Sequence, residues 1–373
     1  MRVVFCISSL GLGGAEEIVC RLANFFSAEH DVDLVLIQRC KEDLSRIKNL
    51  NKNVKLKVVL PGVASSTSFL FRIKNVFSYF LSPFLAIYLW LFLSLKRADI
   101  IHVNLTQFAL VSFFWGIFFR AGNKIVQTFH TNLHLLKEWQ KIIFKLSWKV
   151  ARKIIVEIDE KEISKIAFFV KKDKIIFIPF AIGGEWRTFN LTSNKILSFG
   201  SLARLRIFEK KYDLIIEALS ELKKAGFFFN YFIGGDGPDF DVIKRLVDKY
   251  GLVDNVFFLG YVADPSDFFK RIDLFLVATV DSECGIAGLQ ALKSGVPIVG
   301  VNTFERSSSL ARMDPGSIMY ANTSQELSQI LSFFYDNIDL LSYHKALVQE
   351  KACLLDDHKM MESYKSVFRI QNS

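Results

Sequence analysis

The feature that most constrains the fold of this chain is a regular alternation of short apolar runs with stretches of helical periodicity. The run "RVVFCIS" leads into the glycine turn "SLGLGGAEE", then into the helical stretch "EEIVCRLANFFSAE" and a second apolar run, "DVDLVLIQ". Apolar strands joined through helices predict parallel sheets, because parallel neighbours need crossover connections and are covered on both faces. The chain is therefore predicted to be an α/β protein.

A second cycle of the same kind begins about halfway along the sequence. "KILSFGSL" is a strand with a glycine turn, "KKYDLIIEALSELKKAG" is an amphipathic helix, and "FNYFIGGDGPDF" is the next strand and turn. Two such cycles in 373 residues predict two Rossmann-like β/α/β domains facing across a cleft. We place the boundary near residues 182–184, which gives domains over 1–182 and 183–373. The last helix, over residues 360–368, is a candidate to pack back on the first domain.

Positive charge is concentrated in the first half of the chain. Residues 1–180 carry 26 Lys and Arg against 14 Asp and Glu, whereas the remaining residues carry 21 against 24. This asymmetry predicts that the first domain alone faces an anionic partner. The basic residues are interleaved with aromatic and aliphatic ones, and no helix-turn-helix, ribonucleoprotein or zinc pattern is present. We therefore expect an anionic membrane surface as partner, and no nucleic acid.

One apolar stretch, residues 76–95 ("VFSYFLSPFLAIYLWLFLSL"), has no charged residue over about the length that crosses a bilayer. Pro83, the serines and tyrosines within it and the strand-like "ADIIHV" that follows favour a buried or interfacial helix. A transmembrane anchor is the alternative interpretation. Lys and Arg residues flank the stretch on both sides and suit lipid headgroups in either case.

The cysteines bear on the cellular compartment. Five are present and scattered, with no CxxC pair: Cys6, Cys20, Cys40, Cys284 and Cys353. An odd, dispersed set predicts a reducing cytoplasm without structural disulfides or a thiolate metal site. The opening "MRVVFCISSL" reads as a strand and lacks the features of a signal peptide. No Asp/Glu cluster has metal-ligand spacing, so no metal is expected.

The first glycine loop has two interpretations. "GLGGAE" approaches a dinucleotide fingerprint, but the third glycine would fall on Glu16, and the second strand ends in Gln38 and Arg39 where an acidic ribose ligand should stand. An NAD enzyme is therefore not expected. The loop predicts either a tight strand-to-helix turn or an anion site formed by backbone N–H groups at a helix amino terminus.

The order of the motifs is similar to that of a known family. "SLGLGGAEEIVCRLA", "ADIIHVN", "GGDGPDFDVIKRL", "VFFLGYV" and "DLFLVATVDSECGIAGLQALKSGVPIVG" follow one another along nearly the whole chain. In this order they resemble the GT-B glycosyltransferases of family four, a group with retaining nucleotide-sugar transferases of bacterial surface-glycan pathways. The resemblance implies that the first domain holds the acceptor and the second the nucleotide sugar.

The resemblance also implies site residues in the first domain. Gly13 and Gly14 match a glycine pair that lies against the phosphates and sugar of the donor. His130, in "VQTFHTN", matches a histidine beside the transferring sugar and is a candidate catalytic residue. From the residues alone, a single histidine at a strand end is more often a structural residue with satisfied hydrogen bonds.

In the second domain, Lys210 matches a lysine that neutralises the departing diphosphate, and it is a second catalytic candidate. The family's arginine position is occupied by Ser201, so Arg204 or Arg206 would have to take its role. The alternative is that these cations are solvated loop charges. Gly235 and Gly237, after the second strand of this domain, predict a turn with positive φ that leads into a helix.

The stretch "DSECGIAGLQALKSGVPIVG" matches the family's donor loop and departs from it. Aligning "GVP" places Ser282 and Gln290 where the family carries two glutamates. The resemblance implies that Gln290 holds the ribose hydroxyls, which an amide can still bind. Ser282 is too short to replace the glutamate that contacts the donor sugar, but Asp281 and Glu283 flank it, and one of them could take this contact if the loop shifts by a residue. Glu283 is our third catalytic candidate. Backbone N–H groups for the donor would come from the start of the helix: Cys284, Gly285 and Ile286.

The predicted activity is transfer of a hexose or N-acetylhexosamine from a nucleotide diphosphate sugar, expected to be UDP-linked, to a lipid-linked, lipopolysaccharide- or capsule-type glycan. Retention of configuration is implied by the resemblance only. No cofactor is expected, because the nucleotide sugar is the substrate. We expect a bacterial cytoplasmic protein that lies peripherally on the inner face of the cytoplasmic membrane. The alternative is a GT-B scaffold protein of a glycan-assembly complex that has lost transfer with the missing carboxylates and arginine.

Overall fold

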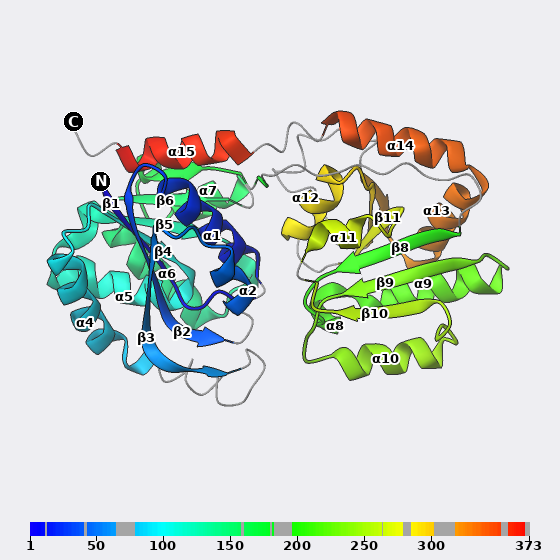
Figure 1. Cartoon of the computed structure of the whole chain (residues 1–373), viewed down its shortest axis with the longest axis horizontal. Helices are drawn as coiled ribbons and strands as arrows, with labels where there is room; N and C mark the ends of the chain where they lie inside the picture. Colours follow the sequence, from blue (N-terminus) through cyan, green and yellow to red (C-terminus); the bar gives the residue numbers. More distant parts are fainter. Residues whose placement is uncertain are drawn as a thin grey trace. The chain divides into compact units, whose positions relative to one another are not determined.

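The computed structural model describes residues 1–11, 13–40, 43–64, 79–157, 160–179, 181–182, 196–262, 264–278, 285–301, 318–351 and 357–369. The chain forms two compact units, one of Met1–Phe180 with His358–Ser373 and the other of Ala181–Asp357. It therefore leaves the first unit once and returns to it with its last helix, drawn in red in Figure 1.

The first unit is built on a seven-stranded parallel sheet in the order β3-β2-β1-β4-β5-β6-β7. Its strands are β1 (Arg2–Ile7), β2 (Asp31–Cys40), β3 (Val54–Ala64), β4 (Ile100–Asn104), β5 (Ile125–Phe129), β6 (Lys153–Val156) and β7 (Ile175–Phe177). The central strands β4 and β5 are buried along their whole length, as expected of parallel strands covered on both faces.

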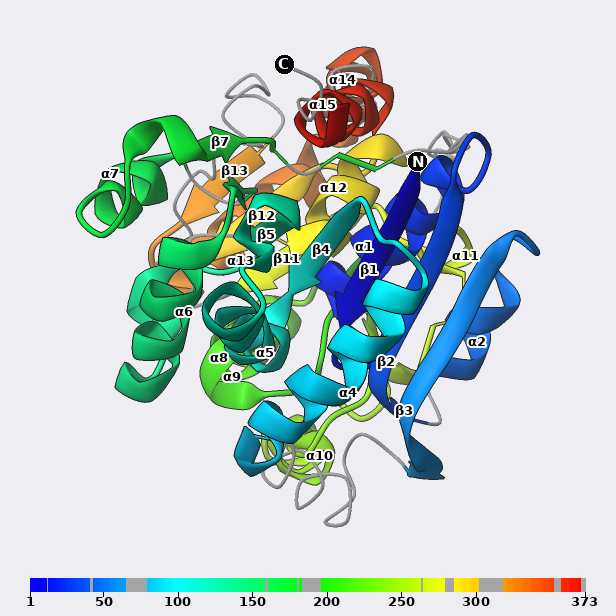
Figure 2. The ribbon, with the colours of Figure 1, turned by 90° about the vertical axis from the view of Figure 1, so that its left-hand side faces the viewer.

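Helices cover both faces of this sheet. They are α1 (Gly14–Phe26), α2 (Asp43–Lys48), α4 (Ser82–Leu95), α5 (Leu105–Phe118), α6 (Glu138–Val150), α7 (Lys161–Ala167) and α15 (Asp357–Arg369), with short 3₁₀ turns at Ala121–Lys124, Leu133–Leu135 and Lys172–Lys174. Successive strand residues point to opposite faces. Val4 and Val103 share a core with α4, α5 and α6, which follow one another in Figure 2. Phe5 meets Phe26 of α1 and Phe368 of α15 on the other face.

The second unit contains a six-stranded parallel sheet in the order β10-β9-β8-β11-β12-β13. Its strands are β8 (Leu197–Leu202), β9 (Phe229–Gly234), β10 (Val256–Gly260), β11 (Leu274–Ala278), β12 (Ile298–Val301) and β13 (Ile318–Ala321). Its helices are α8 (Ile207–Lys210), α9 (Tyr212–Lys224), α10 (Phe240–Lys249), α11 (Pro265–Phe269), α12 (Gly285–Lys293), α13 (Ser324–Asp336) and α14 (Ile338–Lys351).

The two sheets share one topology, and this confirms the predicted α/β class with two parallel sheets. In each, the strand order reverses between the first strand and the fourth: between β1 and β4, and between β8 and β11. Ligands of such sheets bind outside the carboxyl ends of the strands at this switch point. The predicted site residues Gly13, His130 and Lys210 come after the carboxyl ends of β1, β5 and β8, respectively.

The apolar stretch near residue 90 forms α4, which the sequence predicts as a helix over residues 76–95. Leu85, Ala86, Leu89 and Leu93 are buried on its inner side. Its outer side is also apolar but exposed. In the part of the chain that the structure describes, no helix is long and apolar enough to cross a membrane.

Candidate functional site

Lys210 lies at the carboxyl edge of the second sheet, at the switch point. It borders a hollow of about 30 Å³ between the ends of β8 and β11. The lining residues are Ser201, Leu202, Ala203, Lys210, Tyr212, Ile215, Phe275, Leu276, Val277 and Ala278. The topology and the position of Lys210 agree with the edge at which this class of sheet binds ligands.

The loop that carries the cations is held by the turn after β9. Ala203 N donates to Gly234 O at 3.1 Å, and Leu205 N donates to Asp236 O at 3.1 Å. Gly235 has a φ of 122°, as the sequence predicts, and a Cβ there would lie 2.0 Å from the carbonyl oxygen of Ala203. Only glycine permits this approach, so the glycine turn fixes the path of the loop that ends at Lys210.

Of the two candidate arginines, Arg204 is exposed, and Arg206 pairs with Glu209 at 3.0 Å between Nη1 and Oε1. Ser201, at the family's arginine position, is buried. Its Oγ donates to Leu276 O at 2.6 Å and accepts from Tyr231 Oη at 2.8 Å. Ser201 is thus a structural residue that ties β8 to β11 beneath the hollow, and it presents no charge there.

Tyr212 also lines this hollow. The residue is 1% exposed, and its hydroxyl has no hydrogen-bond partner among the residues that the structure describes. Burial, with Tyr231 nearby, holds the pKa of Tyr212 well above its ordinary value, so the hydroxyl stays neutral. The volume of the hollow suits one water molecule or one polar atom of a ligand.

The second cluster of predicted donor residues is on α12. Gly285 opens the helix with a φ of 61°, and Ile286 and Gln290 are half-buried. Because β11 ends at Ala278 and α12 follows it, the start of α12 belongs to the same carboxyl edge as Lys210. Ser282, Glu283 and Cys284 lie outside the described residues.

In the first unit, the glycine loop is enclosed by charged side chains. The Arg46 guanidinium, from α2, donates to the carbonyl oxygens of Leu10, Gly11 and Gly13, the last at 3.0 Å. On the other side, a Cβ on Gly13 would lie 2.1 Å from a carboxylate oxygen of Glu16. An anion at the amino end of α1 would therefore have to displace the Glu16 carboxylate.

His130, after β5, is held from both ring nitrogens. Its Nδ1 is 2.6 Å from Glu157 Oε2, and its Nε2 is 2.7 Å from Asn104 Oδ1. The side chain of His130 is 5% exposed, and that of Glu157 is fully buried. His130 therefore occupies the carboxyl edge of the first sheet as part of a buried polar cluster.

The sequence does not predict Arg46, Asn104 or Glu157 as residues of this site. Glu157 had a signal, because it is a carboxylate in the apolar run "RKIIVEI", where a charge requires a partner. Asn104 had a similar signal, because it is a polar residue at the end of the apolar run "ADIIHVN". Nothing in the sequence connects Arg46 with the glycine loop.

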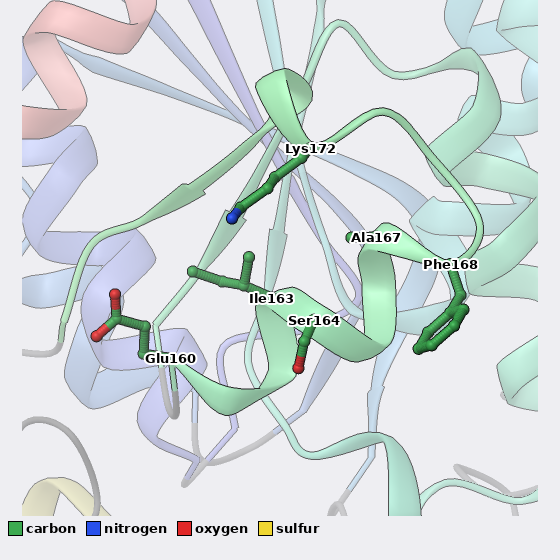
Figure 3. Close-up of a pocket in the computed structure, with 6 residues that line it drawn as sticks. All are labelled: Glu160, Ile163, Ser164, Ala167, Phe168 and Lys172. Carbon is green, nitrogen blue, oxygen red and sulfur yellow. The ribbon is translucent and has the colours of Figure 1, made fainter.

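Two hollows elsewhere in the described residues are lined by other side chains. One, of about 510 Å³, lies beside α7, where Ile163 lies between Glu160 and Lys172 and the Phe168 ring lies at one side (Figure 3). Another, of about 470 Å³, is lined by Arg120, Arg152 and Lys174 at the amino ends of β5, β6 and β7. Over the described ranges, no three His, Cys, Asp or Glu side chains group as metal ligands would.

Two family models match the chain. The one described as Glycosyltransferase Family 4 matches residues 12–182, and the one described as Glycosyl transferases group 1 matches residues 186–346. Each model therefore covers most of one predicted domain, and the two follow one another along the chain.

A curated relative is the O-antigen biosynthesis glycosyltransferase WclY of Escherichia coli, 29% identical over 116 residues. The match covers 31% of this chain and 31% of WclY, about a third of that relative's length. Among solved structures, Anabaena Alr3699/HepE in complex with UDP-glucose has a TM-score of 0.77 at 15% identity, covering 98% of this chain and 99% of that one. WaaG, a glycosyltransferase involved in lipopolysaccharide biosynthesis, has a TM-score of 0.71 at 16% identity, covering 98% and 99%. At identities of 15% and 16%, the likeness to these structures shows that this chain shares their fold.

Proposed function

Because the chain belongs to the GT-B glycosyltransferases of family four, we propose that it transfers a sugar from a UDP-linked donor to a lipid-linked, lipopolysaccharide- or capsule-type glycan. The observation that carries the proposal is the position of Lys210 at the hollow between β8 and β11, where the strand order reverses. The names of two relatives support the chemistry: HepE was solved with UDP-glucose, and WclY is an O-antigen glycosyltransferase.

In the proposed reaction, the bond between the anomeric carbon and the diphosphate oxygen breaks, and the electron pair leaves with the diphosphate. The Lys210 ammonium neutralises the charge that develops on this leaving group. The Gln290 amide binds the ribose hydroxyls, and the start of α12 directs N–H groups at the donor. The acceptor oxygen then bonds the same face of the sugar while its proton passes to the departing diphosphate oxygen, which gives retention of configuration.

We further propose that the first unit faces an anionic membrane, where a lipid-linked acceptor is found. The outer side of α4 supports this, since Phe84, Leu91 and Leu95 are 70%, 59% and 85% exposed. On the neighbouring helix α5, Ile117 and Phe118 are also more than half exposed. Contiguous exposed apolar side chains of this extent are typical of interaction surfaces rather than of solvent-facing helices.

Cations lie close to this apolar surface. Lys57 Nζ is 5.5 Å from the centre of the Phe92 ring, and Lys96 Nζ is 6.0 Å from it. Arg97 and Lys124 line a hollow of about 250 Å³ at the end of α4 that contains no carboxylate. Apolar side chains beside Lys and Arg match the acyl and phosphate layers of an anionic bilayer.

The test of the proposed function is donor consumption and product configuration. The full-length protein is incubated with a bacterial lipid extract and UDP-glucose, UDP-galactose or UDP-N-acetylglucosamine, and release of UDP is measured. We expect one donor to be consumed and the product to keep the donor's anomeric configuration by NMR. Lys210→Ala should lower kcat roughly a hundredfold, and Lys224→Ala, exposed at the far end of α9, should leave it unchanged.

Ser201 gives the scaffold alternative its specific support, because a buried, hydrogen-bonded serine stands where the resemblance implies an arginine. A scaffold would neither consume these donors nor bind their nucleotides. A product with inverted anomeric configuration would refute retention, but it would still support sugar transfer.

A further inference from the structure

Six buried side chains form a closed ring of hydrogen bonds at the carboxyl edge of the first sheet. His130 contacts Glu157 and Asn104, as described above. Glu157 Oε1 accepts from Tyr364 Oη at 2.5 Å, and Tyr364 Oη is 3.2 Å from Thr128 Oγ1. The ring continues from Thr128 to His102, at 2.6 Å, and from His102 to Asn104, at 3.4 Å. It joins the ends of β4, β5 and β6 to the last helix, α15.

With Glu157 ionised, the donors and acceptors of this ring have one consistent arrangement. Tyr364 gives its only proton to the carboxylate, so Thr128 donates to Tyr364, and His102 Nε2 donates to Thr128. His102 Nδ1 then accepts from Asn104 Nδ2, which also donates to Cys6 O at 3.2 Å. The amide orientation is thereby fixed, because a reversed Asn104 would place its oxygen against the Cys6 carbonyl.

This arrangement leaves His130 between two acceptors. Its Nδ1 faces the Glu157 carboxylate, and its Nε2 faces Asn104 Oδ1. Both nitrogens must therefore donate, and a ring that donates twice carries two protons and a positive charge. The buried carboxylate of Glu157 balances that charge, as a buried ion requires.

The surroundings agree with this distribution of charge. His102 is fully buried, and burial together with the charge of His130 holds its pKa well below the ordinary value, which keeps it neutral. Burial also raises the pKa of Tyr364 well above its ordinary value, so it remains a donor. The Cys6 thiol, whose pKa burial raises, is neutral as well. The ring thus holds one cation and one anion.

The backbone beside Asn104 is held in an unusual conformation. Leu105, the first residue of α5, has a φ of 64°, in the left-handed region that a branched, bulky side chain rarely adopts. Strain of this kind persists where the surrounding structure fixes it and is common next to functional sites. Here it accompanies the turn that directs Asn104 at His130.

We propose that Glu157 and Tyr364 are positioning residues of the transfer site, which hold His130 as a doubly protonated ring in one orientation. His130 then acts as a fixed positive charge beside the reacting sugar, and it does not accept a proton from the acceptor. The last helix of the chain is in this way a working part of a site built on the first sheet. The role in transfer rests on the proposed function, whereas the protonation of His130 does not depend on it.

The test is a long-range ¹H–¹⁵N spectrum of the full-length protein with ¹⁵N-labelled histidine, in which each ring nitrogen reports whether it carries a proton. The chain has six histidines, and a His130→Gln sample identifies the signals of His130. We expect both nitrogens of His130 to carry a proton at neutral pH, because both face acceptors. In Glu157→Gln, one of them should lose its proton at the same pH. Tyr364→Phe, which keeps the ring packing of α15, should shift the signals in the same direction.

The matched control is Glu29→Gln. Glu29 pairs with Lys365 at 2.8 Å on the exposed side of α15, so this variant loosens the same helix without touching the ring. It should leave the His130 signals unchanged. Once a donor is identified, Glu157→Gln and Tyr364→Phe should lower kcat roughly tenfold without changing KM for the donor.

An unprotonated nitrogen on His130 in the wild-type protein at neutral pH would overturn the inference. So would wild-type signals in both Glu157→Gln and Tyr364→Phe. A wild-type protein that consumes no nucleotide sugar, but has the doubly protonated ring, would contradict the proposed function instead. The two failures are therefore distinguishable.

Discussion

At the scale of single residues, Lys211 lies in a strained backbone conformation near the carboxyl edge of the second sheet. It joins α8 to α9 in the left-handed region, with φ 39° and ψ 42°. A residue with a side chain costs about 1–2 kcal/mol in that conformation. Lys211→Gly relieves this cost, but glycine also adds conformational entropy to the unfolded chain, which offsets part of the gain. The free energy of unfolding should therefore rise by up to about 1 kcal/mol.

Urea unfolding measures this change. Glu217→Gly, inside α9, should have the opposite effect and lower the free energy of unfolding by about 1 kcal/mol. A Lys211→Gly protein that is less stable than the wild type would show that the left-handed conformation is not strained.

His102 makes stability depend on pH. Its pKa is well below the ordinary value in the folded protein, whereas an unfolded histidine binds a proton near pH 6.5. The unfolded chain thus binds one more proton, and the stabilisation present above about pH 6.5 is lost as the pH falls, by roughly 1.4 kcal/mol per unit. His30, whose pKa is also lowered by burial, adds a contribution of the same sign.

The free energy of unfolding, measured between about pH 5 and pH 7, should therefore decrease as the pH is lowered. His102→Gln keeps a hydrogen-bond donor and an acceptor at this position. Its free energy of unfolding should depend less steeply on pH, by the equivalent of about one bound proton. An unchanged slope would mean that His102 is protonated in the folded protein.

The residues of the site were predictable to different degrees. Lys210 and Gln290 follow from motif order, because each stands at a fixed place after a strand. Glu157 and Tyr364 do not, because they are 207 positions apart and meet only through the return of α15. Their roles depend on a contact between distant segments, which local pattern does not encode.

At the scale of elements, the strands with continuous apolar residues were predictable, whereas the edge strands β3 and β13 were not. In β3, "VKLKVVLPGVA" alternates lysines with apolar residues and contains a proline, as edge strands often do, which weakens the strand signal. β13 has only four residues. For α4, composition predicts a helix but cannot say which side is covered, because both sides are apolar.

The outer side of α4 gives an element-scale prediction. Phe84→Ser and Leu91→Ser should each weaken binding to vesicles that contain anionic lipid by about fivefold or more, because each removes an exposed apolar side chain from the proposed interface. Sedimentation with vesicles measures the binding. Their free energies of unfolding should change by less than about 0.5 kcal/mol.

Phe333→Ser is the control for this experiment, because Phe333 is 52% exposed on α13 of the other unit. It should bind vesicles like the wild type. Equal losses in all three variants would indicate non-specific adsorption and contradict an interface on α4.

At the scale of the whole molecule, the return of α15 makes the carboxyl end of the chain part of the first unit. Its buried side chains are Met360, Met361, Tyr364, Val367 and Phe368. At about 1.5–3 kcal/mol for each buried side chain, their loss is comparable to the total stability of a domain. In a chain that ends at residue 356, the first unit should therefore no longer unfold cooperatively. Tryptophan fluorescence measures this unfolding.

A chain that ends at Arg369 keeps α15 whole and should unfold like the full-length protein. Cooperative unfolding of the first unit in the shorter chain would show that α15 is dispensable for its core.

We propose that the second unit binds a nucleotide at the edge of its sheet where Lys210 and Gln290 lie. Isothermal titration of the purified full-length protein with UDP, GDP and CMP tests it most directly. We predict binding of UDP that weakens roughly ten- to a hundredfold in Lys210→Ala, which loses a charge-assisted contact, and also weakens in Gln290→Ala. Lys224→Ala and Gln329→Ala, both exposed in the same unit, should bind like the wild type. Absence of binding by all three nucleotides, or binding that neither Lys210→Ala nor Gln290→Ala weakens, would contradict the account.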